Sequence, residues 1–260
     1  MTLADRTIAQ LLRVHDDLAG RAAALSDDDL ALTSGASDWT VAQVLSHLGS
    51  AAEIRTAGLE AALTGGDPPG QDFNPGVWDR WNAKSPRAQA EDYVAAEAAC
   101  LAMVEGLSAE QRAELLVPVG FLPRPLDVAS WGALWLNESA QHSWDVRVAG
   151  DPDARVDDAA ADVLLEHFGG ALGFLLGFSG KADALAGEAA VAIGDTGLVL
   201  SVTDTVALTT GGAATATWSG GSESVIRLFG GRLKPPYIPA ELSVTGNVGL
   251  DDLRRVFPGY

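Results

Sequence analysis

Two side chains able to bind a metal ion lie four residues apart in the stretch WLNESAQHSWDVRVAG, residues 135–150. If this stretch is helical, Glu138 and His142 lie one turn apart on the same side of the helix. That side also carries Trp131 and Trp135, so we expect it to face the interior of a helical bundle. A buried, unpaired carboxylate costs several kcal/mol, and a buried imidazole also needs partners. The two polar side chains therefore predict a compensating contact.

A third candidate ligand, His47, lies in the stretch DWTVAQVLSHL, which also has helical periodicity. Val44 and Leu48 flank it, so His47 lies on or beside the inward side of its helix. Two facing helices could bring two imidazoles and one carboxylate together, which is the three-ligand set of a catalytic zinc with an open fourth position. Ni²⁺, Fe²⁺ or Co²⁺ could use the same ligands. The spacing alone is more typical of a surface ion pair, and the expected burial is what brings a metal site level with that alternative.

The composition and net charge of the chain argue against some classes of binding partner. The chain has 260 residues, 47% of them hydrophobic, and a formal net charge of −18 with a pI near 4.4. Such a charge repels phosphate backbones and anionic lipid, so we expect neither a nucleic-acid nor a membrane partner. A small anionic substrate would need a local cation. The acidic N-terminus does not resemble a signal peptide, and the apolar run ALGFLLGF is too short to span a bilayer, so we expect a cytoplasmic protein.

Cysteine usage points to an external source for any thiol chemistry. The chain has one cysteine, Cys100, within an alanine-rich helical run, so neither a disulfide framework nor a Cys-x-x-Cys pair can form. If the protein works with a thiol, that thiol belongs to a small molecule.

The elements that must position the candidate ligands are helices. The first 150 residues have four helical stretches, at 3–24, from 38 onward, at 87–107 and at 127–150. Thr40 and Gln43 form a capping-box pattern at the start of the second stretch. A Gly-, Pro- and Asp-rich segment at 65–82 reads as a loop. Helices of this length predict an up-and-down four-helix bundle.

The second half has a different pattern. A helix is expected over 156–177, followed by strand-like stretches at 190–204, 206–210, 214–220, 223–231 and 240–246, and by a closing helix at 250–257. Gly-Gly pairs at 211–212, 220–221 and 230–231 have the spacing of turns in an antiparallel sheet. We therefore expect an α+β fold in two domains, a helical domain at 1–152 and an antiparallel sheet with helices at 153–260.

Several motifs resemble a known family. SDWTVAQVLSHLGS is similar to the segment gWtvrdvlaHla that opens the mycothiol-dependent maleylpyruvate isomerase family, a branch of the DinB-like bundles. NESAQHSWDVRVAG is similar to that family's second signature, in which Glu and His precede a Trp-Asp pair. The stretches RLFGGRLKP, LSVTGN and LDDLRRVFPG resemble its second, sterol-carrier-like domain. The resemblance covers nearly the whole chain and is most specific in the two helical motifs.

The resemblance implies a site and a cofactor. The family's metal ligands correspond to His47, Glu138 and His142, and its thiol is mycothiol. An arginine of the second domain is linked to activity in the family, and Arg232 is the best match. The long Pro-rich connection GGRLKPPYIPAELSV departs from the family pattern around Arg232. Arg232, Trp135 and Trp78 are our candidate substrate-binding residues, with Arg232 holding a substrate carboxylate.

The expected function is that of a metal-dependent enzyme, a mycothiol-dependent isomerase or S-transferase. A divalent metal, Zn²⁺ or another, would activate a mycothiol-type thiol, which then adds to an electrophilic small molecule. The alternatives are a non-catalytic protein that binds a lipid or another small molecule, and a metal sensor. The sequence leaves open the substrate, the metal in vivo, and the choice between monomer and homodimer.

Overall fold

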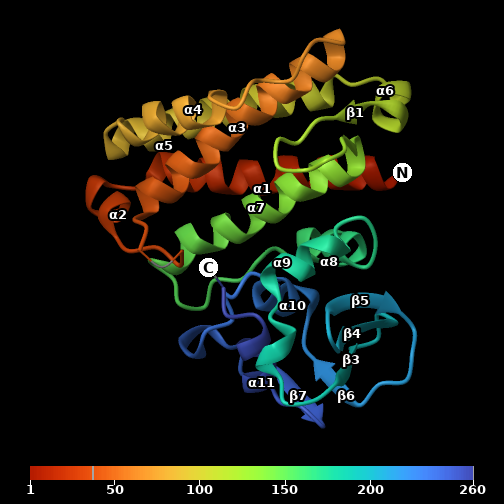
Figure 1. The fold of residues 1–260 in the computed structure, drawn as a ribbon. Helices are drawn as coiled ribbons and strands as arrows, with labels where there is room; N and C mark the ends of the chain where they lie inside the picture. Colours follow the sequence, from red (N-terminus) through yellow and green to blue (C-terminus); the bar gives the residue numbers. More distant parts are fainter. Residues whose placement is uncertain (37, 260) are drawn as a thin grey trace. The chain divides into compact units, whose positions relative to one another are not determined.

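The computed structural model describes residues 1–36 and 38–259, and these divide into two compact units. The first unit, Met1–Asp151, is helical, and the second, Pro152–Tyr260, contains a five-stranded sheet with helices (Figure 1). The predicted α+β fold class is confirmed.

Four long helices build the first unit: α1 (Leu3–Ala24), α3 (Val41–Thr64), α5 (Pro86–Glu105) and α7 (Val128–Val148). Each begins at a residue whose side chain accepts a hydrogen bond from the first turn, namely Thr2, Thr40, Ser85 and Asp127. Such caps satisfy backbone N–H groups that have no partner within the helix. The predicted capping box of Thr40 and Gln43 is present.

The long helices pack along one another around an apolar core (Figure 1). Helix α3 packs against α5 and α7, and α1 packs against α5 and α7. The core side chains between α1, α3 and α5 include Leu18, Leu45, Leu48 and Tyr93. Apolar burial on this scale is the main stabilising contribution to a bundle.

Three shorter helices and a two-stranded sheet complete this unit: α2 (Asp27–Ala31), α4 (Phe73–Asn82), α6 (Ala109–Glu114), β1 (Leu116–Val117) and β2 (Leu126–Asp127). Helix α4 lies within the segment predicted to be a loop, and that prediction was wrong. No side chain caps its N-terminus at Asp72. Tertiary contacts hold it instead: Val77 and Trp81 are buried, and the Trp81 indole donates a hydrogen bond of 2.9 Å to Glu53 on α3.

The second unit begins with α8 (Asp158–Phe168). The helix expected over 156–177 ends at Phe168, because Gly169 and Gly170 follow it. A 3₁₀ turn, Gly173–Leu175, and the short α9 (Leu176–Ser179) then complete the apolar run. Among the described residues no single helix is long and apolar enough to cross a membrane. The bent pair of α8 and Gly173–Ser179, with 87° between its arms, meets the criterion on length and composition alone.

The sheet comprises β3 (Ala189–Ile193), β4 (Leu198–Val202), β5 (Val206–Thr210), β6 (Ala216–Ser219) and β7 (Ser243–Gly246), in the order β5-β4-β3-β6-β7. All neighbouring strands are antiparallel except β3 and β6, which run parallel, so the expected purely antiparallel sheet is in fact mixed. Strands β5 and β7 form its two edges.

Residues 223–231, predicted as a strand, form most of helix α10 (Ser222–Phe229) instead. Glu223 and Arg227, one turn apart, form a buried ion pair with two hydrogen bonds of 2.8 and 3.0 Å, since a helix brings side chains four residues apart together. The Gly pair 230–231 ends this helix and is not a hairpin turn. Gly231 has φ +68°, and the N–H groups of Gly231 and Arg232 donate back to Leu228 and Arg227, as in a Schellman motif.

The remainder of the unit is short. Two 3₁₀ turns, Ala182–Ala184 and Pro235–Tyr237, lie in the connections, and the predicted closing helix is present as α11 (Leu250–Val256).

Candidate metal centre

Helix α7 carries two of the three candidate ligands. Glu138 and His142 lie one turn apart on it, and Glu138 Oε2 is 3.5 Å from His142 Nε2. Most of the helix is buried, including Trp135 and Trp144, so its position within the bundle is closely defined.

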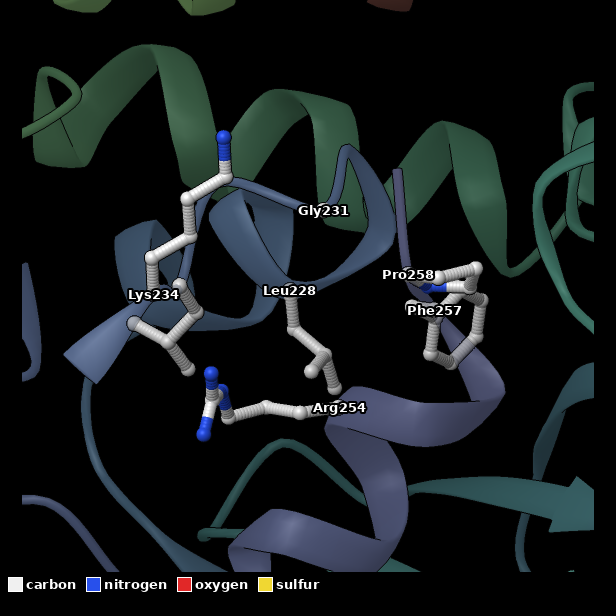
Figure 2. Close-up of a pocket in the computed structure, with 7 residues that line it drawn as sticks. Leu228, Gly231, Lys234, Arg254, Phe257 and Pro258 are labelled. Atoms are coloured by element: carbon white, nitrogen blue, oxygen red, sulfur yellow. The ribbon is translucent and has the colours of Figure 1, made fainter. Parts of the chain in front are cut away.

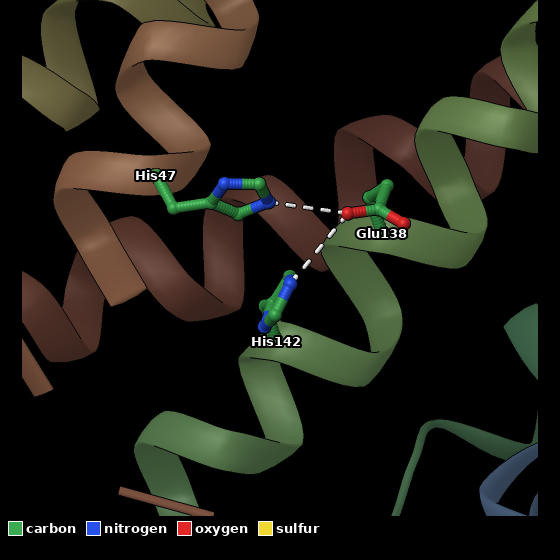
Figure 3. A group of neighbouring side chains, drawn as sticks. All are labelled: His47, Glu138 and His142. Carbon is green, nitrogen blue, oxygen red and sulfur yellow. Dashed lines mark hydrogen bonds and ion pairs between the residues drawn. The ribbon is translucent and has the colours of Figure 1, made fainter. Parts of the chain in front are cut away.

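Helix α3 brings the third candidate ligand, His47, to the same point. His47 Nε2 lies 3.2 Å from the same Glu138 oxygen, and the centroids of the two imidazole rings are 4.8 Å apart (Figure 3). One ligand atom from each of the three side chains lies within 4.8 Å of the other two. The three candidate ligands proposed from the sequence therefore lie close together in the structure, one on α3 and two on α7.

The spacing suits a small divalent ion. Zinc bonds to His N and carboxylate O at about 2.0–2.2 Å, which places neighbouring ligands of a tetrahedral site roughly 3.3 Å apart. The two shortest separations here, 3.2 and 3.5 Å, match that value. Two imidazole nitrogens and one carboxylate oxygen also form a donor set that zinc prefers.

The three side chains differ in exposure. The His142 side chain is 11% exposed, His47 31% and Glu138 47%. The prediction that all three lie in the interior therefore holds for His142 and is wrong for Glu138. His47 and Glu138 thus keep part of their side-chain surface open to solvent.

The two histidines determine the protonation state of Glu138. Partial burial acts to raise the pKa of Glu138, but hydrogen bonds and charge interactions with His142 and His47 outweigh it and hold that pKa well below the usual range. The carboxylate is therefore ionised at neutral pH, as a metal ligand must be.

Asp145 orients one of the two imidazoles. It is fully buried, and its Oδ2 lies 2.8 Å from His142 Nδ1, which leaves Nε2 of that ring directed at Glu138. A carboxylate behind a ligating histidine fixes the ring and its tautomer. No comparable partner of His47 Nδ1 exists among the described residues. The only signal of this role in the sequence is the position of Asp145 three residues after His142.

A second residue that the sequence analysis passed over, Trp39, contacts both imidazoles. Its ring centroid lies 5.2 Å from that of His47 and 6.2 Å from that of His142, nearly parallel to the latter at 23°. Trp39 directly precedes Thr40, the cap of α3, and is 39% exposed. A loop residue of this kind has no periodicity that could have revealed its contacts.

The two tryptophans predicted to bind substrate lie in different settings. Trp135 is buried; its indole donates a 2.6 Å hydrogen bond to Glu97, and the Arg55 guanidinium lies 4.7 Å from its ring centre. Trp78, on α4, is 46% exposed, and within the described residues it has no hydrogen bond or ring contact with the three candidate ligands. The structure brings neither indole into the cluster.

The single thiol of the chain is unsuited to nucleophilic chemistry. Cys100 is fully buried on α5, and burial raises the pKa of its thiol to about 11. It is therefore protonated at neutral pH, and a thiolate is the reactive form.

Arg232 belongs to the second unit. It follows the Gly pair that ends α10, and its Nη1 donates to the Gly230 carbonyl at 3.1 Å. A cavity of about 40 Å³ lies beside the neighbouring Gly231 (Figure 2), and Arg232 is not among the residues that line it. Its lining combines two cations with apolar side chains: Leu228, Gly231, Leu233, Lys234, Arg254, Phe257 and Pro258.

The fold and the cluster together define a class of protein: a helical bundle with a His, Glu, His set, joined to an α+β unit. The sequence profile of the mycothiol maleylpyruvate isomerase N-terminal domain matches residues 11–147. The chain belongs to this family, and the predicted resemblance is confirmed.

Two solved structures share the fold over nearly the full length. The crystal structure of the mycothiol-dependent maleylpyruvate isomerase has a TM-score of 0.65 and 13% sequence identity, and the match covers 95% of each chain. A mutant of that enzyme, with one histidine replaced by alanine, gives a TM-score of 0.65, 12% identity and the same coverage. No curated protein sequence matches the chain.

Proposed function

We propose that the protein is a metal-dependent enzyme that uses a mycothiol-type thiol to attack an electrophilic small molecule. The observation that carries this proposal is the arrangement of His47, Glu138 and His142, whose ligand atoms lie within 4.8 Å of one another beside solvent. Three protein ligands leave a coordination position for a small molecule, whereas structural zinc usually has four protein ligands. Membership of a family named for a mycothiol-dependent isomerase supports the thiol.

His47 and His142 would hold the metal through Nε2 and Glu138 through its carboxylate, with Asp145 holding the His142 ring in place. A divalent metal supplies a positive charge that lowers the pKa of a bound thiol, so that thiolate forms at neutral pH. Cys100, buried and protonated, does not compete with this external thiol.

The reaction that fits is a conjugate addition. The thiolate sulfur forms a bond to an alkene carbon conjugated to a carbonyl, and the π electrons move onto the carbonyl oxygen. Rotation about the resulting single bond and loss of the thiolate give the trans isomer with no net use of thiol. If the enolate instead takes up a proton and the carbon–sulfur bond stays, the product is an S-conjugate.

Arg232 is our candidate for binding a substrate carboxylate. With a net charge of −18, the chain repels small anions unless a local cation attracts them. A guanidinium pairs with a carboxylate through two parallel hydrogen bonds, which a lysine cannot reproduce.

The test begins with metal content. Purified protein is expected to hold close to one divalent ion per chain, and His47→Ala, Glu138→Ala and His142→Ala are expected to lose it while keeping their helical circular dichroism. A matched control is His15→Ala, because His15 is a buried histidine on α1 outside the cluster. Wild type without stoichiometric metal, or ligand variants that retain it, would refute the proposal.

Turnover is tested with mycothiol and a cis-configured, carboxylate-bearing enone. Wild type is expected to convert it to the trans isomer or to a thiol conjugate, which mass spectrometry distinguishes. Arg232→Gln is expected to raise KM by roughly ten-fold or more for the carboxylate substrate, and much less for its methyl ester. An equal effect on both substrates would contradict the role of Arg232.

A further inference from the structure

Trp39 is a large apolar side chain that the fold leaves partly exposed beside a polar cluster. Its indole contacts both imidazoles and is 39% exposed, while the adjoining His47 and Glu138 side chains are 31% and 47% exposed. Burying an indole fully in the core would stabilise the protein by a few kcal/mol. Single exposed apolar side chains are common, and what sets Trp39 apart is its contact with both candidate imidazole ligands.

The loop that carries Trp39 is fixed to both ligand helices. The Gly35 N–H donates to the Asp145 carbonyl on α7 at 2.9 Å, and the Ser34 N–H donates to the Trp39 carbonyl at 2.9 Å. Thr33 pairs with Thr40, the cap of α3, through an isolated β-bridge. These bonds tie the indole to α7 on one side and to α3 on the other.

Gly35 shows how close this attachment is. A Cβ at that position would lie 2.7 Å from both Asp145 Oδ1 and the Trp144 ring, so only glycine lets the loop approach the helix. The close approach of Gly35 to α7 brings the start of this segment against the helix that carries Glu138 and His142.

Distances place the indole within reach of anything bound at the cluster. A metal held by Nε2 of His47 lies about 2 Å from that nitrogen. The imidazole centroid is itself 5.2 Å from the Trp39 centroid. A ligand that extends a few atoms from the metal on the side of Trp39 can therefore reach the exposed part of the indole, which contacts both imidazoles.

We propose that Trp39 is a specificity-determining residue, the apolar wall against which the carbon skeleton of a metal-bound thiol packs. This inference rests on the proposed function, because it assumes a metal at His47, Glu138 and His142. Under this proposal Trp39 determines which thiols bind well, whereas His47, Glu138 and His142 bind the metal.

The test measures thiol binding directly on the metal-loaded full-length protein. Co²⁺ is loaded in place of the native metal, and two thiols are titrated while the cobalt–thiolate absorption is followed. One is 2-mercaptoethanol, which is small and polar, and the other is 2-phenylethanethiol, which has an aromatic group near the sulfur. The readout is the ratio of their dissociation constants, which does not depend on the fraction of folded protein.

Trp39→Ala is expected to bind Co²⁺ with an affinity within about three-fold of wild type. Its preference for the aromatic thiol, measured as the ratio of the two dissociation constants, is expected to fall by about ten-fold because part of an apolar contact is lost. Trp39→Phe keeps a ring and is expected to lower it by about three-fold. Leu32→Ala is the matched control, because Leu32 is a 42% exposed apolar residue on the same connecting segment. It is expected to leave both values unchanged.

Each other outcome separates the two proposals. If wild type binds neither Co²⁺ nor thiol, the proposed function fails. If wild type binds both and Trp39→Ala keeps the wild-type preference, the metal centre stands and the inference about Trp39 is overturned. If Trp39→Ala loses Co²⁺ while folded, the indole holds the imidazoles and the inference is also overturned. If Trp39→Ala does not fold, the preference of Trp39→Phe decides.

Discussion

The two imidazoles of the cluster are held by different interactions. The Trp39 ring contacts both imidazoles, but His142 is also nearly buried, with its Nδ1 2.8 Å from the buried Asp145 carboxylate, whereas His47 is more exposed. A hydrogen bond that a ring donates to a charged acceptor fixes the ring more strictly than a ring contact does. We therefore expect His142 to be the more rigid of the two candidate ligands.

Replacing Asp145 by Asn tests this. Asp145→Asn keeps the shape but removes the charge behind His142, and metal affinity is expected to fall by roughly 10–100-fold. The measurement is competition with a chelator of known affinity. A His142→Ala protein that is purified without metal can still bind added metal weakly through His47 and Glu138, and in that background Asp145→Asn is expected to change this weak affinity little. An equal loss in both backgrounds would mean that Asp145 acts through the fold and not through His142.

Residue types and spacing were enough to predict the three candidate ligands. Glu138 and His142 share a helical side, and His47 lies on a second amphipathic stretch, so both signals are local in sequence. Asp145 and Trp39 lie in the quoted motifs, yet their roles depend on a buried contact and on the path of a loop. Neither follows from periodicity.

At the scale of elements, the four long helices could be predicted because each combines a cap with an apolar period of about 3.6 residues. Helices α4 and α10 could not be predicted from the sequence in this way. The sequence of α4 contains Pro and two Gly residues within or just before it, and packing of Trp81 on α3 stabilises the helix against that local preference. In α10, Val, Ile, Leu and Phe in a short run fit a strand equally well, and only the Glu223–Arg227 pairing distinguishes the two.

The junction of α3 and α4 makes a prediction about stability. Gly49 lies under Trp81, and a Cβ there would come within 2.2 Å of the indole ring. Gly49→Ala is expected to destabilise the protein by about 1–3 kcal/mol, because the ring must move out of a packed position. Urea unfolding followed by circular dichroism measures this.

The control is Gly20→Ala on α1. Gly20 is an exposed helical glycine with nothing within 4 Å of its added Cβ. Alanine there is expected to stabilise the helix by about 0.5–1 kcal/mol. If both variants shift stability in the same direction, packing of Trp81 on Gly49 does not contribute as described.

At the scale of the whole molecule, all three candidate ligands belong to the first of the two units, Met1–Asp151. A metal that binds only the folded helical unit stabilises that unit by mass action, by about 2.7 kcal/mol at a free concentration one hundred times Kd. Calorimetry is expected to show one transition that moves up with added Zn²⁺ and one that does not. In His142→Ala, added Zn²⁺ is expected to leave the midpoint temperature of both transitions unchanged. Two transitions that shift together in wild type would contradict the assignment of the site to one unit.

The change of pattern near residue 150 was visible in the sequence, since helical periodicity gives way to β-branched runs and regular glycines. The pairing of the strands in the sheet was not visible in the sequence. The parallel neighbours β3 and β6 are separated along the chain by β4 and β5, and a hairpin reading joins only consecutive strands.

The two edges of that sheet limit its growth. Strand β7 has only four residues, Ser243–Gly246, and ends at a glycine with φ +131°, while β5 ends in two exposed threonines. A short, polar edge offers few consecutive backbone donors and acceptors to a strand of another molecule. We therefore expect the five-stranded sheet to have little tendency to recruit a sixth strand and start a fibril, even in concentrated protein.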